Sequence, residues 1–178
     1  MSKKSRLETY IREVPDFPIP GILFKDISPL FLHPEIIKET QVDLTEYWRS
    51  KGATKVIGIG SRGFLFGPQM AADLGAGFVI ARKKGKLPPE TLEVSYELEY
   101  GQATIEIVKD SIVPGDRVIV HDDLLATGGT ALAAAQLAKE SGAEVIGFSF
   151  IIALTFLNGH EKLHAFTQDI HTLINFDQ

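Results

Sequence analysis

Four short apolar runs alternate with helix-forming segments, and this alternation restricts the chain to a small set of folds. The runs occupy residues 55–59, 77–81, 117–120 and 145–153 and are rich in Val and Ile. Because they lack a polar face, they are typical of strands buried on both sides, which occur mainly in parallel sheets. The alternation therefore predicts an α/β fold, with a mainly parallel sheet flanked by helices.

The prolines between residues 15 and 34 interrupt regular structure, so residues 16–34 are predicted to form an irregular arm. A short amphipathic helix is expected before it, because Leu7, Tyr10, Ile11 and Val14 keep a helical spacing. The remaining helices are expected at 34–50, with Pro34 at the first position, at 64–74 and at 131–141.

With 178 residues, the length indicates one domain, 1–178, that buries a core without disulfides or zinc. The 18 basic and 23 acidic residues give a formal charge of −5, which disfavours a nucleic-acid partner. Because Cys is absent, a disulfide framework, a Cys-ligated metal and a Cys nucleophile are excluded. The uncharged apolar run 145–157 is too short for a membrane helix, and no apolar segment follows the basic residues 1–6. We therefore expect a cytoplasmic protein without a membrane partner.

The strongest functional motif lies where the third apolar run ends. Asp122 and Asp123 stand at the C-terminal end of that strand, and the loop 126–130, with the sequence ATGGT, opens the helix at 131–141. Backbone N–H groups at a helix N-terminus form an anion site suited to phosphate, and the threonines add hydroxyl donors. The two acids should face a ligand group that carries hydroxyls or positive charge. A sugar diol beside a 5′-phosphate would therefore suit both the acid pair and the anion site. The alternative is a plain turn with two solvated acids.

A second glycine-rich turn follows the first apolar run. Gly58, Gly60 and Gly63 fit the Gly-x-Gly-x-x-Gly fingerprint of dinucleotide-binding proteins. The expected acid is missing, and Arg82 and Lys83 stand about 20 residues on, as they would for the 2′-phosphate of NADP. An NADP-binding protein is thus an alternative for this segment, although it leaves the loop 126–130 unexplained.

Residues 83–109 form a long excursion between the second and third runs. Its alternating stretches predict a β-hairpin, and long segments of this kind are usually functional. The basic turn 82–86 opens it and is interpreted either as an anion contact or as a solvated turn. His160 and His164 have the i, i+4 spacing of a metal pair, but no third ligand is nearby, so a structural role is favoured.

The segment 122–130, DDLLATGGT, resembles the phosphoribosyl pyrophosphate (PRPP) motif of the type I phosphoribosyltransferase family. The resemblance covers nearly the whole chain and is closest to the branch that uses adenine. That narrower match rests on segments 15–18, 21–29, 61–68, 82–88 and 98–101. Two residues depart from the family pattern: Gly60 stands where an acid is usual, and His121 where an aliphatic residue is usual.

This resemblance implies transfer of ribose 5-phosphate from PRPP to adenine, which gives AMP and pyrophosphate with Mg²⁺ as cofactor. It also implies a homodimer, an N-terminal arm at 1–34 over the site, and a flexible lid at 83–109. Mg²⁺ is expected to be held mainly by substrate oxygens and water. The alternative on the same fold is a PRPP-sensing regulator, which would need a DNA-binding module and a basic face.

The resemblance assigns the site residues in five groups. The 5′-phosphate is assigned to Ala126, Thr127, Gly128, Gly129 and Thr130, and the ribose to Asp122 and Asp123. Pyrophosphate is assigned to Ser61, Arg62, Arg82, Lys83 and Lys86. Adenine is assigned to the ring of Phe24 and the backbone of Leu23 and Lys25. Catalysis is assigned to Glu99, Arg62 and Arg82.

Overall fold

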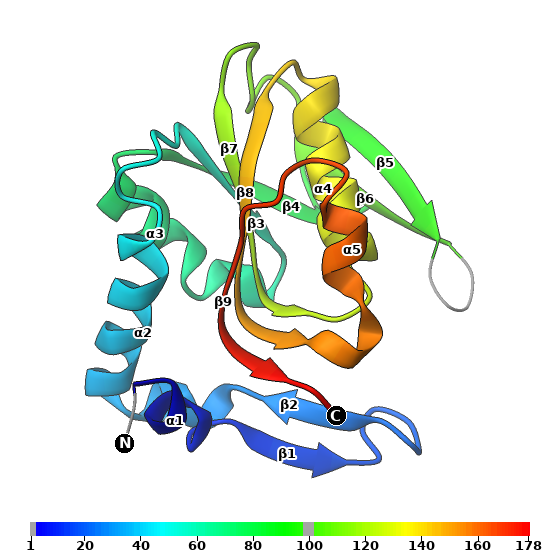
Figure 1. The fold of residues 1–178 in the computed structure, drawn as a ribbon. Helices are drawn as coiled ribbons and strands as arrows, with labels where there is room; N and C mark the ends of the chain where they lie inside the picture. The colour runs from blue at the N-terminus through cyan, green and yellow to red at the C-terminus, as the bar shows by residue number, and fades with distance from the viewer. Residues whose placement is uncertain (1–2, 98–101) are drawn as a thin grey trace. The chain divides into compact units, whose positions relative to one another are not determined.

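The structure, a computed structural model, describes residues 3–97 and 102–178 (Figure 1). Contacts divide the chain into two compact units, Met1–Asp43 and Leu44–Gln178. The first unit extends past the expected arm, because it includes most of helix α2, Pro34–Glu46, which ends four residues before its predicted end at residue 50. Pro34 opens that helix as predicted.

In the described part of the second unit, seven strands form one sheet in the order β5-β6-β4-β3-β7-β8-β9. Strands β4, β3, β7, β8 and β9 are parallel to one another, whereas β6 runs antiparallel to both β4 and β5. All four predicted strands are therefore confirmed, as is the mainly parallel sheet. The strands are β3 Lys55–Ile59, β4 Gly77–Lys83, β5 Thr91–Glu97, β6 Gln102–Val108, β7 Arg117–Leu125, β8 Glu144–Leu154 and β9 Ile170–Phe176.

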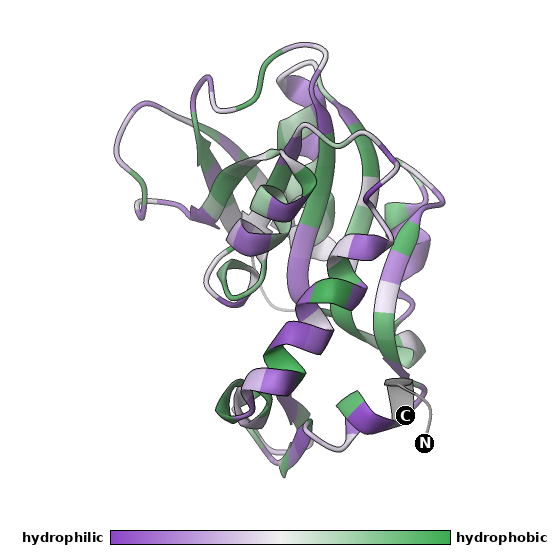
Figure 2. Ribbon diagram, turned by 90° about the vertical axis from the view of Figure 1, so that its left-hand side faces the viewer, coloured by the Kyte–Doolittle hydropathy of each residue, from purple (hydrophilic) through white to green (hydrophobic). Residues whose placement is uncertain are grey.

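Helices cover both faces of the sheet, and Figure 2 shows the central strands coloured mainly as hydrophobic. Alternate strand residues point to opposite faces, so Ile57 packs in the cluster that contains the alanines of α4, while Val56 packs with Trp48 and Met70. The fourth predicted helix is α4, Gly129–Glu140. The helix expected at 64–74 begins later, as α3 Gly67–Leu74 after the short 3-10 turn η2, Arg62–Phe64. A second short turn, η3 Thr155–Leu157, precedes the helix α5, Gly159–Leu163.

The N-terminal prediction is wrong in two respects. Helix α1 covers only Lys3–Glu8, and Val14 lies in a strand, β1 Arg12–Pro15. The arm also contains the strand β2, Leu23–Asp26, and the 3-10 turn η1, Ser28–Leu32. The two strands pair as an antiparallel hairpin, which supplies backbone hydrogen bonds that local periodicity does not reveal. Proline is tolerated there because both strands of a two-stranded sheet are edges.

The excursion 83–109 contains the predicted hairpin, formed by β5 and β6. Because β6 also pairs with β4, the hairpin extends the main sheet at one edge. Sequence reasoning missed β9 at the other edge, although Ile170, Thr172 and Ile174 alternate there in a pattern typical of a strand.

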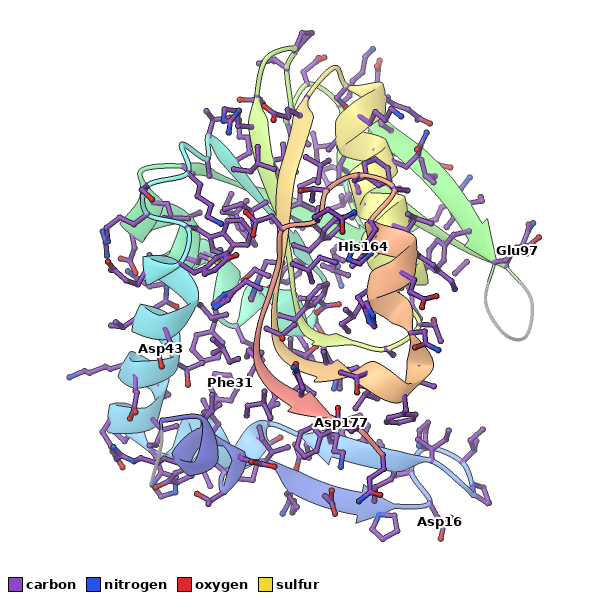
Figure 3. All side chains as sticks on the ribbon, in the orientation of Figure 1. Asp16, Phe31, Asp43, Glu97, His164 and Asp177 are labelled. Atoms are coloured by element: carbon purple, nitrogen blue, oxygen red, sulfur yellow. The ribbon has the colours of Figure 1, made fainter. Side chains whose placement is uncertain are left out.

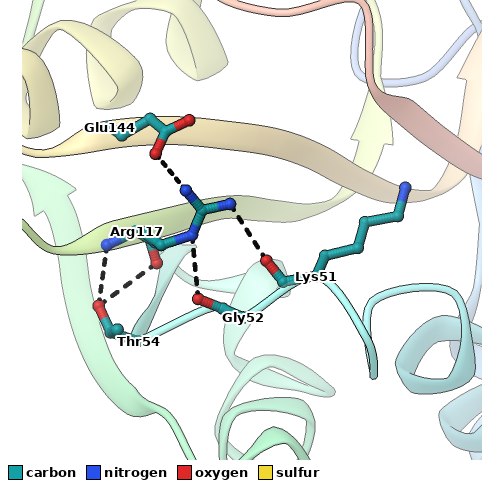
Figure 4. Close-up of polar contacts among 5 residues, drawn as sticks. All are labelled: Lys51, Gly52, Thr54, Arg117 and Glu144. Atoms are coloured by element: carbon teal, nitrogen blue, oxygen red, sulfur yellow. Dashed lines mark hydrogen bonds and ion pairs between the residues drawn. The ribbon is translucent and has the colours of Figure 1, made fainter.

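The amino ends of β3, β7 and β8 are joined by the side chain of Arg117 (Figure 4). Its guanidinium donates to the carbonyls of Gly52 and Lys51, each at 3.2 Å, and forms an ion pair with Glu144. Its backbone N–H donates to Thr54 Oγ1 at 2.9 Å. These contacts fix the amino ends of the strands. The predicted site residues lie at the opposite edge of the sheet, at the carboxyl ends.

Candidate active site

A pocket of about 190 Å³ lies at the carboxyl ends of the adjacent strands β4, β3 and β7. Because the three strands are parallel, the loops that follow them meet at one edge of the sheet, where α/β proteins bind ligands. The described lining residues are Ile59, Gly60, Ser61, Arg62, Arg82, Lys83, Tyr96, Ile105, Asp122 and Thr130. Three sequence motifs separated by up to 69 residues therefore contribute to one polar pocket, as Ser61 and Thr130 illustrate.

Asp122 and Asp123 lie near the carboxyl end of β7, as expected, although the strand continues to Leu125, beyond the predicted run 117–120. The strand is longer because its pairing with β8 continues as far as Leu125 and Ala153. Consecutive strand residues point to opposite faces. Asp122 accordingly lines the pocket, whereas Asp123 is only 1% exposed.

Asp123 is paired with the cation that follows β3. Its Oδ2 lies 3.2 Å from Arg62 Nε, and the Arg62 side chain is 40% exposed. A buried carboxylate is strongly destabilising without such a partner. The pair therefore holds the Arg62 guanidinium at the pocket wall.

Both carboxyl groups have raised pKa values. Burial raises the pKa of Asp122 well above its usual range, and the charge of Asp123 raises it further. Burial also raises the pKa of Asp123, against the opposing effect of Arg62. A positive charge that develops in the pocket would favour the ionised form of Asp122, so this carboxyl group responds to the charge of a ligand.

The loop 126–130 leads from β7 into α4, as the sequence predicts. Gly128 precedes the helix with φ of +79°, a conformation that favours glycine, and an added Cβ would lie 2.6 Å from the Gly159 carbonyl oxygen. The first N–H groups of α4 have no partner within the helix, which makes this end suited to an anion. Thr130 lines the pocket, while Ala126, Thr127, Gly128 and Gly129 are not among its described lining residues.

The basic turn after β4 places only some of its cations at the pocket. Arg82 and Lys83 line it, whereas Lys86 is exposed and is not among the described lining residues. The Lys86 backbone takes part in holding the turn, because its carbonyl accepts a hydrogen bond from Arg82 Nη1 at 3.4 Å.

Glu106 on β6 lies beneath this turn and was missed by the sequence analysis. It is 2% exposed, and its Oε1 accepts hydrogen bonds from the N–H groups of Lys86 and Leu87, both at 2.9 Å. Burial opposes ionisation, but these donors and the Thr91 hydroxyl hold the pKa of Glu106 below its usual value. The carboxylate thus fixes the backbone of the basic turn. Its only sequence signal was an acid within an otherwise apolar stretch of strand.

The glycine-rich turn after β3 is explained by close packing. An added Cβ at Gly63 would lie 2.8 Å from the His121 carbonyl oxygen, so the turn needs glycine there to pass over β7. At Gly60, where the family usually has an acid, an added Cβ would lie 2.5 Å from the Phe64 ring. The Phe64 ring therefore occupies the space that a side chain at position 60 would take.

The residues assigned to adenine lie in the first unit, on strand β2. Phe24 contacts Phe17 with ring centroids 5.1 Å apart, in an edge-to-face arrangement. Lys25 is 3% exposed and pairs with Glu13, while Leu23 is 43% exposed. Glu99, the predicted acid near the base, lies outside the described residues; Glu97, the last residue of β5, is exposed (Figure 3).

His121, the second departure from the family pattern, is a buried side chain with a structural role. It is fully buried, and its Nδ1 lies 3.0 Å from the Ser149 carbonyl oxygen, to which it donates in the neutral form. Burial lowers the pKa of His121 to about 4. Between pH 6.5 and about 4, His121 is therefore mostly neutral in the folded protein, whereas the same side chain in the unfolded chain would be mostly protonated.

This burial predicts a measurable pH dependence of stability. Because the folded pKa lies below the unfolded value, the stability present above pH 6.5 is lost as the pH falls towards 4. By pH 5 the loss is about 2 kcal/mol. We expect His121→Val to remove this part of the pH dependence, measured as the free energy of unfolding in urea at pH 7.5 and pH 5. Asp122 and Asp123 have raised pKa values, so they change the stability in the opposite direction over this pH range. They do so in the wild type and in His121→Val alike, so their contribution cancels when the two proteins are compared.

The matched control is His164→Gln, which removes an exposed histidine and should keep the wild-type difference between the two pH values. If His121→Val loses as much stability as the wild type between pH 7.5 and pH 5, His121 does not cause the dependence.

His160 and His164 form a ring pair with centroids 5.8 Å apart. Among the described residues, no cluster of three or more His, Asp or Glu side chains is placed to hold a metal ion. No helix in the described part of the chain is long and apolar enough to span a membrane.

Comparisons with known proteins agree with this geometry. Residues 35–171 match the phosphoribosyl transferase domain family. The adenine phosphoribosyltransferase of Phocaeicola vulgatus is 54% identical over 170 residues, which cover 96% of this chain and 95% of that protein. The crystal structure of the Rhodothermus marinus adenine phosphoribosyltransferase is 50% identical, with a TM-score of 0.92 over 97% of this chain and 98% of that one.

A more distant solved structure is the Trypanosoma brucei adenine phosphoribosyltransferase in complex with AMP, pyrophosphate and ribose 5-phosphate. It is 28% identical, with a TM-score of 0.87 over 98% of this chain and 82% of that one. Identity near 50% over almost the full length, together with the same fold and the PRPP motif at the pocket, leaves one assignment. The chain belongs to the phosphoribosyltransferase family, within its adenine phosphoribosyltransferase branch.

Proposed function

We propose that the pocket at the carboxyl ends of β4, β3 and β7 binds PRPP and transfers its ribose 5-phosphate to adenine. The products are AMP and pyrophosphate, a step of purine salvage. The observation that carries the proposal is the convergence of Arg62, Arg82, Lys83, Asp122 and Thr130 on one pocket. A phosphate loop, cations and a carboxyl group are the three features that PRPP requires of its site.

The charge changes of the reaction fit this arrangement. When the C1–O bond to pyrophosphate breaks, positive charge develops on the ribose ring and negative charge on the leaving group, and adenine N9 then bonds to C1. Groups placed where charge develops lower the barrier most. Arg62 and Arg82 would stabilise the pyrophosphate, with Ser61 and Lys83 beside them. Lys86 would approach from the exposed part of the same turn.

Asp122 would serve the ribose. It lines the pocket with a raised pKa, so positive charge on the ring favours its ionisation in the transition state. Asp123 would act with it, because its contact with Arg62 couples the ribose side of the pocket to the pyrophosphate side. The loop from Ala126 to Thr130 would hold the 5′-phosphate.

Mg²⁺ fits this donor set as a cation held mainly by the substrate. Asp122 and the hydroxyls of Ser61 and Thr130 are oxygen donors at the pocket, and Asp123 is already paired with Arg62. Mg²⁺ prefers oxygen ligands and keeps several waters, so phosphate oxygens of PRPP would complete its coordination. Bound there, it would neutralise charge on the leaving pyrophosphate.

Adenine is proposed to stack on Phe24, with the backbone of Leu23 and Lys25 at its edge, as the family resemblance implies. The support in the structure is local: Phe24 is part of a hairpin in which Leu23 is exposed. The hairpin at 83–109 would close as a lid and exclude water from the cationic centre, with Glu99 near the base.

A homodimer in the cytoplasm completes the proposal. Leu65 and Ile80 are large apolar side chains in the second unit with exposures of 50% and 43%, and they would suit a subunit interface. Sedimentation analysis would test the dimer, and cell fractionation the location.

The substrate assignment predicts that adenine, among the common bases, is the one converted efficiently to nucleotide. The measurement is nucleotide formation from PRPP, Mg²⁺ and each purine or pyrimidine base in turn. Faster turnover of hypoxanthine or guanine would overturn the adenine assignment and leave the PRPP site standing.

Thermal unfolding separates the remaining alternatives. AMP or PRPP with Mg²⁺ should raise Tm, because only a ligand that binds the folded state stabilises it, and NADP should not. A shift with NADP and none with AMP would favour the dinucleotide alternative. Binding of PRPP without turnover of any base would favour the regulator.

A further inference from the structure

Tyr96 is a pocket residue that no sequence motif singled out. It lies on β5, in the hairpin, yet it lines the same pocket as the phosphate-loop residue Thr130. Thr130 Oγ1 donates a hydrogen bond to the Tyr96 hydroxyl at 3.0 Å. The hairpin therefore contacts the phosphate loop through a side-chain hydroxyl.

The Tyr96 ring also contacts the backbone of that loop. An added Cβ at Gly129 would lie 3.3 Å from Tyr96 Cδ2 and 3.6 Å from the Glu97 carbonyl oxygen. Position 129 thus has room for glycine and little more while the ring is in place. Ring packing and the hydroxyl contact fix β5 against the first turn of α4.

The direction of the hydroxyl contact determines what it does when phosphate arrives. Each hydroxyl has one proton to donate and lone pairs that accept. In the structure, Thr130 donates to Tyr96. A phosphate oxygen accepts only, so Thr130 must turn its proton to the phosphate, and the Tyr96 hydroxyl is then placed to donate to Thr130 Oγ1. Hydrogen bonds in such a chain strengthen one another.

We propose that Tyr96 is a positioning residue for the 5′-phosphate, which it serves by donating to Thr130 Oγ1 while Thr130 donates to the phosphate. The inference deepens the proposed function, on which it rests. It makes β5 of the hairpin a part of the phosphate site. This contact should strengthen the binding of a phosphorylated ribose. It should not affect pyrophosphate, which would bind beside Arg62 and Arg82.

The test is Tyr96→Phe, which keeps the ring packing on Gly129 and removes only the hydroxyl. Ribose 5-phosphate and pyrophosphate serve as separate probes in titration calorimetry. We expect the affinity for ribose 5-phosphate to fall roughly three- to tenfold, the usual worth of one hydrogen bond, while pyrophosphate affinity is unchanged. KM for PRPP should rise with little change in kcat, because the contact is made in both the ground state and the transition state.

A double-mutant cycle tests the route through Thr130. Thr130→Val removes the hydroxyl that receives the Tyr96 proton, so adding Tyr96→Phe to it should have almost no further effect on ribose 5-phosphate affinity. The matched control is Ser95→Ala, which removes the neighbouring hydroxyl on β5 that contacts Thr104 Oγ1 at 2.8 Å. This control should bind both probes like the wild type.

Three results would overturn the inference: wild-type affinity of Tyr96→Phe for ribose 5-phosphate, an equal loss for pyrophosphate, or losses that multiply in the double variant. Failure of the proposed function is a separate result. In that case the wild-type protein itself would not bind ribose 5-phosphate.

Discussion

Changing both Asp122 and Asp123 to Asn is expected to lower kcat by about 10²–10³-fold, the scale of losing preorganised electrostatic stabilisation. The double variant loses both the pocket carboxylate proposed to face the ribose and the buried partner of Arg62. The fold should persist, because Asn has nearly the shape of Asp and the pairing of β7 with β8 is made by the backbone.

The single variants should differ because the side chains point to opposite faces of β7. Asp122→Asn removes the carboxylate proposed to face the ribose, so it should lower kcat and weaken pyrophosphate binding less than Asp123→Asn does. Asp123→Asn removes the ion pair of Arg62, so it should also weaken pyrophosphate binding. The measurements are kcat with PRPP and adenine, and pyrophosphate affinity by calorimetry.

Asp110→Asn is the matched control, since Asp110 is exposed and its φ of 64° suits Asn equally well. It should retain wild-type kcat. If the Asp122 and Asp123 double variant retained near-wild-type kcat as well, the two carboxyl groups would have no role beyond the strand.

The second large effect is expected at Glu99. Adenine attacks through N9, and the positive charge left on the purine is relieved when the proton on N7 passes to a nearby carboxylate. General acid–base help of this kind contributes about 10²–10⁴-fold. We expect Glu99→Leu to lower kcat and kcat/KM together by that factor, because the proton exchange acts mainly in the transition state. AMP binding and PRPP affinity should change little.

Glu97→Leu provides the control, because Glu97 is an exposed acid at the end of β5 in the same hairpin. Its kcat should stay near the wild-type value. A Glu99→Leu protein within a few-fold of wild-type kcat would contradict the catalytic role and leave the reaction to the cations and the acid pair.

The sequence by itself determined the central sheet and the positions of its loops. Runs such as Lys55–Ile59 are apolar on both faces, which is compatible only with a strand between two layers of helices. Because such strands are parallel, the loops after β3, β4 and β7 had to meet at one edge. The gathering of Ser61, Arg62, Arg82 and Thr130 was therefore predictable from local patterns.

The N-terminal hairpin was not predictable in this way. Val14 fits the spacing of a helix, yet it pairs with Phe24 across two strands, because ladder hydrogen bonds outweigh a weak local periodicity. The same holds for β9, whose pairing with β8 depends on residues about 20 positions earlier in the chain.

Only the tertiary structure decided which polar side chain faces which partner. Asp122 and Asp123 are identical neighbours in sequence, but the pleat of β7 turns one into the pocket and buries the other against Arg62. Glu106 meets the turn at Lys86 because β6 pairs with β4, and Tyr96 meets Thr130 because α4 packs against β5. A local pattern specifies the element on which a residue lies. The contact that gives a buried carboxylate or a hydroxyl its role depends on neighbouring strands, because a polar group removed from water needs a partner that the folded chain supplies.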